Sequence, residues 1–377
     1  MSNKKKTVFV GMSGGVDSSV SAALLIQSGY DVVGVFIRTW HPDFIECNEE
    51  AERLDAMRVA AHLDIPFLTF DFEDVYKKEV ADYMIAEYKK GHTPNPDVMC
   101  NKYVKFGAFL DKAVSMGADY VATGHYARVE SVKENLVRVG APAERVKRLN
   151  FPSPMKLLCN KDITKDQSYF LWTLNQKQLS KIIFPVGNFK KTEVRKLANK
   201  FKIPVAEKKD SQGICFLGMI DLKDFLKHYI KEKKGEVINE EGKIIGHHDG
   251  VVFHTLGERH RFTITDKTTN DKPYYVVDKD LKKNILIVSQ NPVRKDLAEN
   301  KIKLENLNWI KDIPKENKDY TAQIRYHGEF LLCQIKVSNS NVNENIEVIF
   351  SKPTLVASGQ SVVFYDGDVC LGGGVVV

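Results

Sequence analysis

The sequence predicts an α/β fold class: a doubly wound, mostly parallel sheet, followed by a small central domain and a C-terminal β-barrel. Apolar β-type runs alternate with segments of helical periodicity through the first half of the chain, which is typical of a parallel sheet covered on both faces. From Leu217 a charged stretch intervenes, and from about Pro292 the runs become short and β-rich. The 377 residues also exceed what one hydrophobic core usually serves.

The first half of the chain supplies the elements of the sheet in order. An apolar strand begins at Val8, and further strands are predicted at 31–37, 65–70 and 118–123. Helices are predicted at 17–28, 49–63, 72–90 and 190–201, the first of them ended by Gly29 as a C-cap. Between Val129 and Leu158 the pattern dissolves into a basic segment with three prolines, which predicts an exposed insertion.

A glycine-rich turn joins the first strand to the first helix. Gly14 and Gly15 allow a tight turn whose main-chain N–H groups approach an anion, and the new helix points its positive end at the same place. The hydroxyls of Ser13, Ser18 and Ser19 add donors. A phosphate guest is expected, although the string fits neither the Walker loop nor the dinucleotide fingerprint. The structural alternative is a glycine turn capped by Asp17.

The segment from Gly91 to Lys102 contains two prolines, which exclude it from a helix interior or a central strand. We predict a stiffened loop that presents Asn95, Asp97 and Cys100. A helical turn starting here would place Asp97 and Cys100 on one face, with the thiol near the helix amino end, where thiolate is favoured. Taken alone, the loop favours Asp97 as an N-cap and Cys100 as a small buried hydrophobe.

Three further stretches carry polar side chains with chemical potential. Gly124-His125 follows a predicted strand, so His125 either faces the ligand edge of the sheet or is a structural hydrogen-bonder. Lys165 to Tyr169 opens an apolar aromatic run that either contacts phosphate and an unpaired base or is simply core. Cys215 follows a Gly-Ile turn close to two lysines. It is therefore a better thiolate candidate than Cys47, Cys333 or Cys370.

The last third of the chain predicts small β modules. A short helix at 221–231 precedes a charged linker at 232–246 and β-type runs at 250–254 and 272–277. Five β-rich runs then follow, at 322–326, 330–337, 346–350, 361–365 and 369–371. Their turn signals predict a small β-barrel, a module that commonly binds nucleic acid.

Bulk composition is that of an ordinary globular protein, with 43% hydrophobic and 28% charged residues. The net charge of +6 is uneven, since residues 145–210 hold 16 Lys/Arg against 5 Asp/Glu, which suits a polyanion or merely solvated helix faces. Six scattered cysteines without a Cys-x-x-Cys pair argue against a zinc site or a disulfide framework. The absence of a membrane-length run or a signal segment predicts a cytoplasmic protein without a membrane partner.

Seven motifs, in order over nearly the full length, resemble those of the bacterial tRNA-specific 2-thiouridylases, which are PP-loop ATP pyrophosphatases. They are 11–19, 93–101, 122–126, 165–171, 210–216, 275–280 and 359–365. The resemblance implies ATP-dependent adenylation of the wobble uridine 2-oxygen, then sulfur transfer from a cysteine persulfide to give 2-thiouridine, AMP and pyrophosphate. It implies an adenine nucleotide alpha hydrolase-like catalytic domain at 1–216, a central domain at 217–291 and a tRNA-binding barrel at 292–377.

The resemblance also implies cofactors, partners and residue roles. ATP and Mg²⁺ would be used, with tRNA (the glutamate, glutamine and lysine acceptors) and a sulfur-relay or cysteine desulfurase protein as partners. The ATP site would comprise Gly11, Met12, Ser13, Gly14, Gly15, Val16, Asp17, Ser18, Ile37 and Gly124. The target base would meet Asn95, Pro96 and Asp97, and the tRNA would contact His125, Lys165, Asp166, Gln167, Arg325, Tyr326 and Gln360.

Two cysteines would carry the sulfur chemistry that the resemblance implies. Cys215 would hold the persulfide and Cys100 would be the partner nucleophile, with a transient disulfide between them, while Asp97 would move protons. Either the persulfide attacks the activated base, or Cys100 releases hydrosulfide, which attacks instead.

Two departures from the family pattern are visible, and two other functions remain open. The segment 258–264 lacks the glycines that the family usually has there, and the insertion 130–156 is longer than expected. An amidating synthetase or lysidine-forming tRNA ligase would use the same glycine loop without a cysteine pair. A basic RNA-binding scaffold with a vestigial nucleotide site would not use ATP at all.

Overall fold

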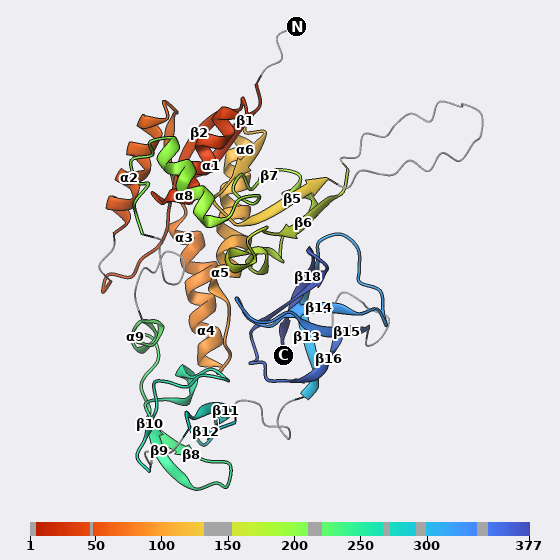
Figure 1. Ribbon diagram of the computed structural model, residues 1–377. Helices are drawn as coiled ribbons and strands as arrows, with labels where there is room; N and C mark the ends of the chain where they lie inside the picture. Colours follow the sequence, from red (N-terminus) through yellow and green to blue (C-terminus); the bar gives the residue numbers. More distant parts are fainter. Residues whose placement is uncertain are drawn as a thin grey trace, which may run out of the picture.

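The computed structural model describes residues 5–45, 48–131, 153–209, 221–266, 272–291, 299–337 and 346–377. These residues form an N-terminal α/β part, a small central β part and a C-terminal barrel (Figure 1). The long helix that ends in α4 (Tyr83–Lys89) runs from the α/β part toward the central part, and the barrel lies beside both (Figure 1). Among the described residues, no helix is long and apolar enough to cross a membrane.

The predicted parallel sheet is confirmed. Its strands are β1 (Thr7–Gly11), β2 (Asp31–Arg38), β3 (Phe67–Asp71), β4 (Tyr120–Ala122) and β7 (Ile182–Ile183), in the order β3-β2-β1-β4-β7. All four pairings are parallel. The chain leaves β1 in one direction for β2 and β3, and returns on the other side for β4. The carboxyl end of β1 is therefore the switch point where such sheets bind ligands.

Helices cover both faces of this sheet, as the alternating pattern predicts. On one face, α1 (Val16–Gln27), α2 (Glu49–His62) and α8 (Lys191–Lys200) pack Val20, Val59 and Val194 into one core cluster. On the other face lie two long helical segments. One consists of α3 (Glu73–Tyr76), the π-helical η1 (Lys77–Asp82) and α4, and the other of α5 (Pro96–Met99), η2 (Cys100–Ala108) and α6 (Phe109–Ser115).

The second of these segments corrects the predicted extent of the proline loop. A helix already begins at Pro96, because proline is tolerated at the first helical position. Asn95 is its N-cap and accepts a hydrogen bond from the Val98 N–H at 3.2 Å. The structural alternative that made Asp97 the cap is therefore wrong, and Asp97 lies in the first turn instead.

The predicted insertion at 129–158 begins and ends as strands. β5 (Ala127–Ser131) and β6 (Met155–Cys159) form an antiparallel hairpin, and β6 also pairs with the barrel strand β18 (Val369–Val376). The residues between the two strands, 132–152, lie outside the described part of the chain. After the hairpin come η3 (Ile163–Lys165), η4 (Ser168–Leu171) and α7 (Gln176–Leu179), and Tyr169 and Trp172 are buried core residues.

The central part follows α9 (Leu222–Lys227) and contains one five-stranded sheet. Its strands are β8 (Gly235–Ile238), β9 (Ile244–His248), β10 (Thr263–Ile264), β11 (Tyr275–Asp280) and β12 (Ile285–Ser289), in the order β10-β9-β8-β12-β11. The predicted linker 232–246 is wrong: it forms the β8–β9 hairpin, whose Val237 and Ile245 are buried. The predicted β run 250–254 is instead a 3-10 turn, η5 (Val251–Phe253).

The C-terminal barrel is confirmed. Its strands are β13 (Glu299–Trp309), β14 (Tyr320–Gln323), β15 (Leu331–Val337), β16 (Ile346–Thr354), β17 (Ser361–Asp366) and β18. A pairing between β13 and β18 closes the ring. Ala322, Val348, Val362 and Phe364 are fully buried in its interior. The sequence prediction missed β13, which is rich in Lys, Glu and Asn.

Acidification is expected to destabilise the central sheet through His248. The Gly250 N–H donates to His248 Nδ1 at 2.9 Å, and Nε2–H donates to the Asn284 carbonyl at 3.2 Å, so the neutral ring satisfies both partners. Burial, with the nearby His254 adding to it, lowers the pKa of His248 from 6.5 to about 4. The stability that this ring contributes is therefore present above pH 6.5 and is lost as the pH falls toward 4.

Urea unfolding at pH 7.5 and pH 5.0 measures this effect. His248 accounts for about 2 kcal/mol of the free energy of unfolding lost between these pH values. His248→Gln, which does not titrate, should show a correspondingly smaller loss. An equal pH dependence in both proteins would contradict the assignment.

Candidate active site

The glycine turn lies at the carboxyl end of β1, at the switch point of the sheet. The Met12 N–H donates to the Val35 carbonyl at 2.8 Å and holds the start of the turn to β2. Gly14 has a φ of +69°, and a methyl group there would collide with the Glu52 carbonyl, so only glycine fits. The hydroxyls of Ser18 and Ser19 donate to the Gly15 carbonyl at 3.2 and 2.7 Å and fix the turn.

Helix α1 begins directly after this turn and has no side-chain cap. Its first N–H groups and the positive end of its dipole therefore remain available to an anion. This is the arrangement in which a helix amino end binds phosphate.

A lysine that the sequence prediction missed lies at the same turn. Lys191, the first residue of α8, donates from Nζ to both carboxylate oxygens of Asp17 at 2.8 Å. The Tyr126 hydroxyl also donates to Asp17, at 2.7 Å. The side chain of Lys191 is 14% exposed, so its charge is largely shielded from bulk water. Because Lys191 is 174 residues from Asp17 in sequence, no local pattern could reveal the pair.

Two other residues expected at the ATP site also lie beside the turn. Gly124 packs so closely against the start of α1 that a methyl group there would lie 2.7 Å from the Ser18 nitrogen. Ile37 is buried near the carboxyl end of β2, the strand next to β1. Glycine at 124 therefore lets the strand β4 approach the helix amino end.

The loop that precedes α5 carries the residues expected at the target base. Asn95, Pro96 and Asp97 are half-buried, and Cys100 is fully buried at the start of η2. The neighbouring Asn101 donates from Nδ2 to the Phe170 carbonyl at 3.3 Å. Its buried Oδ1 has no hydrogen-bond partner among the described residues, so a polar acceptor remains open beside Cys100.

The segment 165–171 joins the glycine turn to the cysteine loop. Gln167 exchanges two hydrogen bonds with Tyr126: its Oε1 accepts from the Tyr126 N–H at 2.9 Å, and its N–H donates to the Tyr126 carbonyl at 2.8 Å. Tyr126 in turn bonds Asp17 of the turn. Three residues beyond Gln167, Phe170 bonds Asn101 beside Cys100. The two candidate centres are therefore linked through one short, well-bonded segment.

Two of the residues expected to contact tRNA are buried. His125 packs against the rings of Phe106 and Phe184, with Nδ1 2.7 Å from the Thr123 hydroxyl, and burial holds the pKa of His125 well below 6.5. Asp166 accepts from the Asn160 N–H at 2.7 Å and the Ser168 hydroxyl at 2.6 Å, and burial raises its pKa. Lys165 and Gln167 are half-buried. The structure thus gives His125 and Asp166 internal partners.

The barrel brings its expected contact residues to the cysteine loop. The Tyr326 ring packs at a tilt against Phe170, with 4.4 Å between the ring centroids. Burial, followed by the negative charges of Asp166 and Asp97, raises the pKa of Tyr326 to about 12. Arg325 precedes it in the same β14–β15 connection. Gln360 is half-buried in the turn between β16 and β17, which packs against residues 92 and 93.

Cys215 lies outside the described residues, as do Cys47 and the rest of 210–220. The pairing of Cys215 with Cys100 therefore stays a prediction. Of the other described cysteines, burial raises the pKa of Cys159 and of Cys333 to about 12, and that of Cys370 further. These three are free, inert thiols, as the sequence suggested for Cys333 and Cys370.

The fold and the glycine turn define a nucleotide-binding α/β protein with two β modules attached. Residues 6–219 match the profile of a family described as tRNA methyl transferase HUP domain. Residues 223–290 match a tRNA methyl transferase PRC-barrel domain, and residues 299–376 match an aminomethyltransferase beta-barrel domain.

Curated relatives match over almost the whole chain. The tRNA-specific 2-thiouridylase MnmA of Streptococcus thermophilus (strain ATCC BAA-491 / LMD-9) is 42% identical over 99% of this chain and 96% of its own length. The enzyme of the same name from Shewanella sp. (strain MR-7) is also 42% identical, over 98% of this chain and 96% of its own length. The chain belongs to the tRNA-specific 2-thiouridylase family. A solved U34-tRNA thiolase from Methanococcus maripaludis aligns with a TM-score of 0.34 and 16% identity, over 60% of this chain and 64% of that one.

Proposed function

We propose that the protein is a tRNA 2-thiouridylase that adenylates the 2-oxygen of the wobble uridine and replaces it with sulfur. The observation that carries the proposal is the segment 165–171, which bonds the glycine turn through Tyr126 and the cysteine loop through Asn101. A phosphate-binding turn and a buried thiol in one connected region suit activation followed by sulfur transfer. Membership in the thiouridylase family supports the same reaction.

The first step is adenylation. The uridine 2-oxygen attacks the α-phosphorus of ATP, a new C–O–P bond forms, and pyrophosphate leaves. The N–H groups at the start of α1 and the ammonium of Lys191 bear the negative charge of the phosphates. The activated carbon now carries AMP as its leaving group. The unmodified carbonyl oxygen is a far poorer leaving group.

The chain also fits a magnesium ion brought by the nucleotide. Mg²⁺ is usually held by substrate phosphates and one or two carboxylates. Asp17, which accepts hydrogen bonds from Tyr126 and Lys191, would be the carboxylate at the turn. When bound, Mg²⁺ neutralises charge on the departing pyrophosphate. Among the described residues, no group of three or more His, Cys, Asp or Glu forms a separate metal cluster.

The second step is sulfur transfer. The terminal sulfur of a Cys215 persulfide attacks the activated carbon, and AMP leaves with the former 2-oxygen. Cys100 then attacks the inner sulfur of the persulfide, so the Cys100–Cys215 disulfide forms and the terminal sulfur stays on the base. Alternatively, Cys100 attacks the persulfide first and the released hydrosulfide displaces AMP. Asp97, in the first turn of α5, moves the protons in either route.

The sulfur donor and the working compartment follow from this chemistry. A persulfide on Cys215 requires a sulfur-relay or cysteine desulfurase protein that delivers the sulfane sulfur, and a thiol reductant that reopens the disulfide. Cys159, Cys333 and Cys370 are free thiols, which is typical of a reducing compartment such as the cytoplasm. The glutamate, glutamine and lysine tRNAs are the proposed acceptors.

Mass spectrometry of nucleosides from treated tRNA tests the proposal. Unmodified tRNA is incubated with the protein, ATP, Mg²⁺ and a persulfide donor, and again without ATP. We expect 2-thiouridine only in the presence of ATP, with one pyrophosphate released per thiolated base. Pyrophosphate without 2-thiouridine would favour another acceptor reaction, and no pyrophosphate would favour a binding scaffold.

A further inference from the structure

The loop that leads to Cys100 is held by both of the other domains within three residues. On the central side, Lys279 at the end of β11 donates from Nζ to the Gly91 carbonyl at 2.7 Å. The Thr93 and Thr255 hydroxyls lie 3.1 Å apart. On the barrel side, the Thr93 N–H donates to the Ser358 carbonyl at 2.8 Å. Residues 91–93 are therefore a junction of all three domains.

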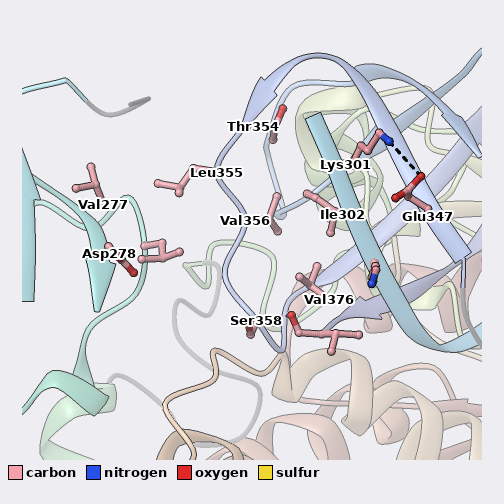
Figure 2. Close-up of a pocket in the computed structure, with 13 residues that line it drawn as sticks. Val277, Asp278, Lys301, Ile302, Glu347, Thr354, Leu355, Val356, Ser358 and Val376 are labelled. Carbon is pink, nitrogen blue, oxygen red and sulfur yellow. Dashed lines mark hydrogen bonds and ion pairs between the residues drawn. The ribbon is translucent and has the colours of Figure 1, made fainter. Parts of the chain in front are cut away.

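Next to this junction the central domain and the barrel face each other across a crevice. This crevice of about 570 Å³ is lined by Val277 and Asp278 on the central side and by Leu355 and Val356 on the barrel side (Figure 2). The crevice also reaches Leu256, which follows Thr255, and Ser358, whose carbonyl accepts from the Thr93 N–H. The junction on residues 91–93 thus lies at the border of this crevice.

Lys279 is the charged group of this junction. Besides the Gly91 carbonyl, its ammonium bonds the His254 carbonyl at 2.9 Å, so one side chain ties the loop to the segment that carries Thr255. Burial lowers the pKa of Lys279 to about 8, while the negative charges of Glu258 and Asp278 partly offset the effect. An ammonium removed from water and given two carbonyl acceptors holds both of them firmly.

Close packing against the central domain restricts the backbone at Gly91. Gly91 has a φ of +80°, and a methyl group there would lie 2.6 Å from the side chain of Leu281, which follows β11. Pro94 and Pro96 then fix two of the backbone dihedrals between the junction and Cys100. A displacement at Gly91 is accordingly passed along a stiff chain to Asp97 and Cys100.

We propose that Lys279 is a positioning residue for thiolation, which fixes the loop of Asp97 and Cys100 by clamping the Gly91 carbonyl to the central domain. The inference rests on the proposed function. It also assigns a role to the family-divergent segment 258–264, since Glu258 accepts from the Thr255 N–H at 3.0 Å and supports the same clamp.

The test compares Lys279→Met with a matched control, Lys223→Met. Lys223 is also a well-shielded lysine, with a side chain 12% exposed, but it bonds Asp249 at 2.7 Å. Two quantities are measured: the single-turnover rate of 2-thiouridine formation at saturating ATP, and the rate at which iodoacetamide alkylates Cys100, followed by peptide mass spectrometry. The midpoint of thermal unfolding is recorded for all three proteins.

In Lys279→Met we expect thiolation to slow by about tenfold or more and Cys100 alkylation to rise by a similar factor, because a small misplacement of a reacting group is costly. The KM for ATP should stay within about twofold, since the glycine turn is not part of the junction. Lys223→Met should lower the unfolding midpoint without changing either rate by more than about twofold.

Wild-type rates in Lys279→Met, or an equal loss in both variants, would overturn the inference. If the wild-type protein forms no 2-thiouridine, the proposed function fails. The alkylation rates of Cys100 would then still test whether Lys279 fixes the loop.

Discussion

Cys100→Ser and Cys215→Ser are each expected to abolish sulfur incorporation while leaving adenylation intact. A serine oxygen neither carries a persulfide nor attacks one at neutral pH, so each variant should lose 2-thiouridine formation by at least about 10²-fold. The glycine turn, the proposed ATP site, is unchanged in both, so pyrophosphate release in the presence of tRNA should persist. Nucleoside mass spectrometry and a pyrophosphate assay on the same samples measure the two steps.

Cys333→Ala is the matched control for these variants. Cys333 is a free, buried thiol in the barrel, and burial raises its pKa to about 12. Removing it should cost some stability but no sulfur transfer. Full thiolation by either Cys100→Ser or Cys215→Ser would exclude the two-thiol route. A thiolation route that needs only one of these thiols would then replace it, whereas pyrophosphate release without any 2-thiouridine would favour the lysidine-type or amidating alternatives.

Lys191→Met is expected to remove most of the adenylation step. The substitution deletes the cation at the glycine turn and leaves the Asp17 carboxylate without its main counter-charge, so the turn both loses attraction for phosphate and gains repulsion. We expect a fall of about 10² to 10³-fold in pyrophosphate release, comparable to the loss of one strong donor at a developing anion. Stopped assays of pyrophosphate at saturating tRNA measure it.

Lys190→Met controls for a general loss of positive charge. Lys190 is the adjacent residue, exposed, and forms the N-cap of the same helix α8. Its loss should change pyrophosphate release by less than about twofold, because an exposed lysine contributes little. Equal effects of the two substitutions would show that Lys191 acts only through the overall charge of the helix.

Much of the fold follows from local signals. The parallel sheet, the glycine turn and most barrel strands are marked by apolar runs with turn residues between them, and the structure confirms them. The missed strands have few such signals. In β8 and β9 the apolar runs at 237–238 and 244–245 are only two residues long and a charged stretch separates them, so the hairpin resembled a linker. Strand β6 pairs with Val369 and Cys370, about two hundred residues away, which no local pattern records.

The candidate site also contains residues that local sequence signals predict and residues that they do not. The need for glycine at 14 and 124 could be predicted because a motif marks both positions, and the structure explains why no larger residue fits. The N-cap was predicted wrongly at Asp97, although a proline at the first helical position points to the preceding Asn95. Lys191 and Lys279 could not be predicted. Each acts on a residue far away in sequence, and only the folded chain brings Lys191 to Asp17 and Lys279 to Gly91.

The most direct test of the two-thiol account is non-reducing peptide mapping after a single turnover. Persulfide-loaded protein, ATP and an excess of unmodified tRNA react without reductant, and the digest is then searched for cross-linked cysteine peptides. The account predicts a Cys100–Cys215 disulfide in an amount equal to the 2-thiouridine formed. Thiolated tRNA with both cysteines still reduced, or with Cys100 joined to another cysteine, would contradict it.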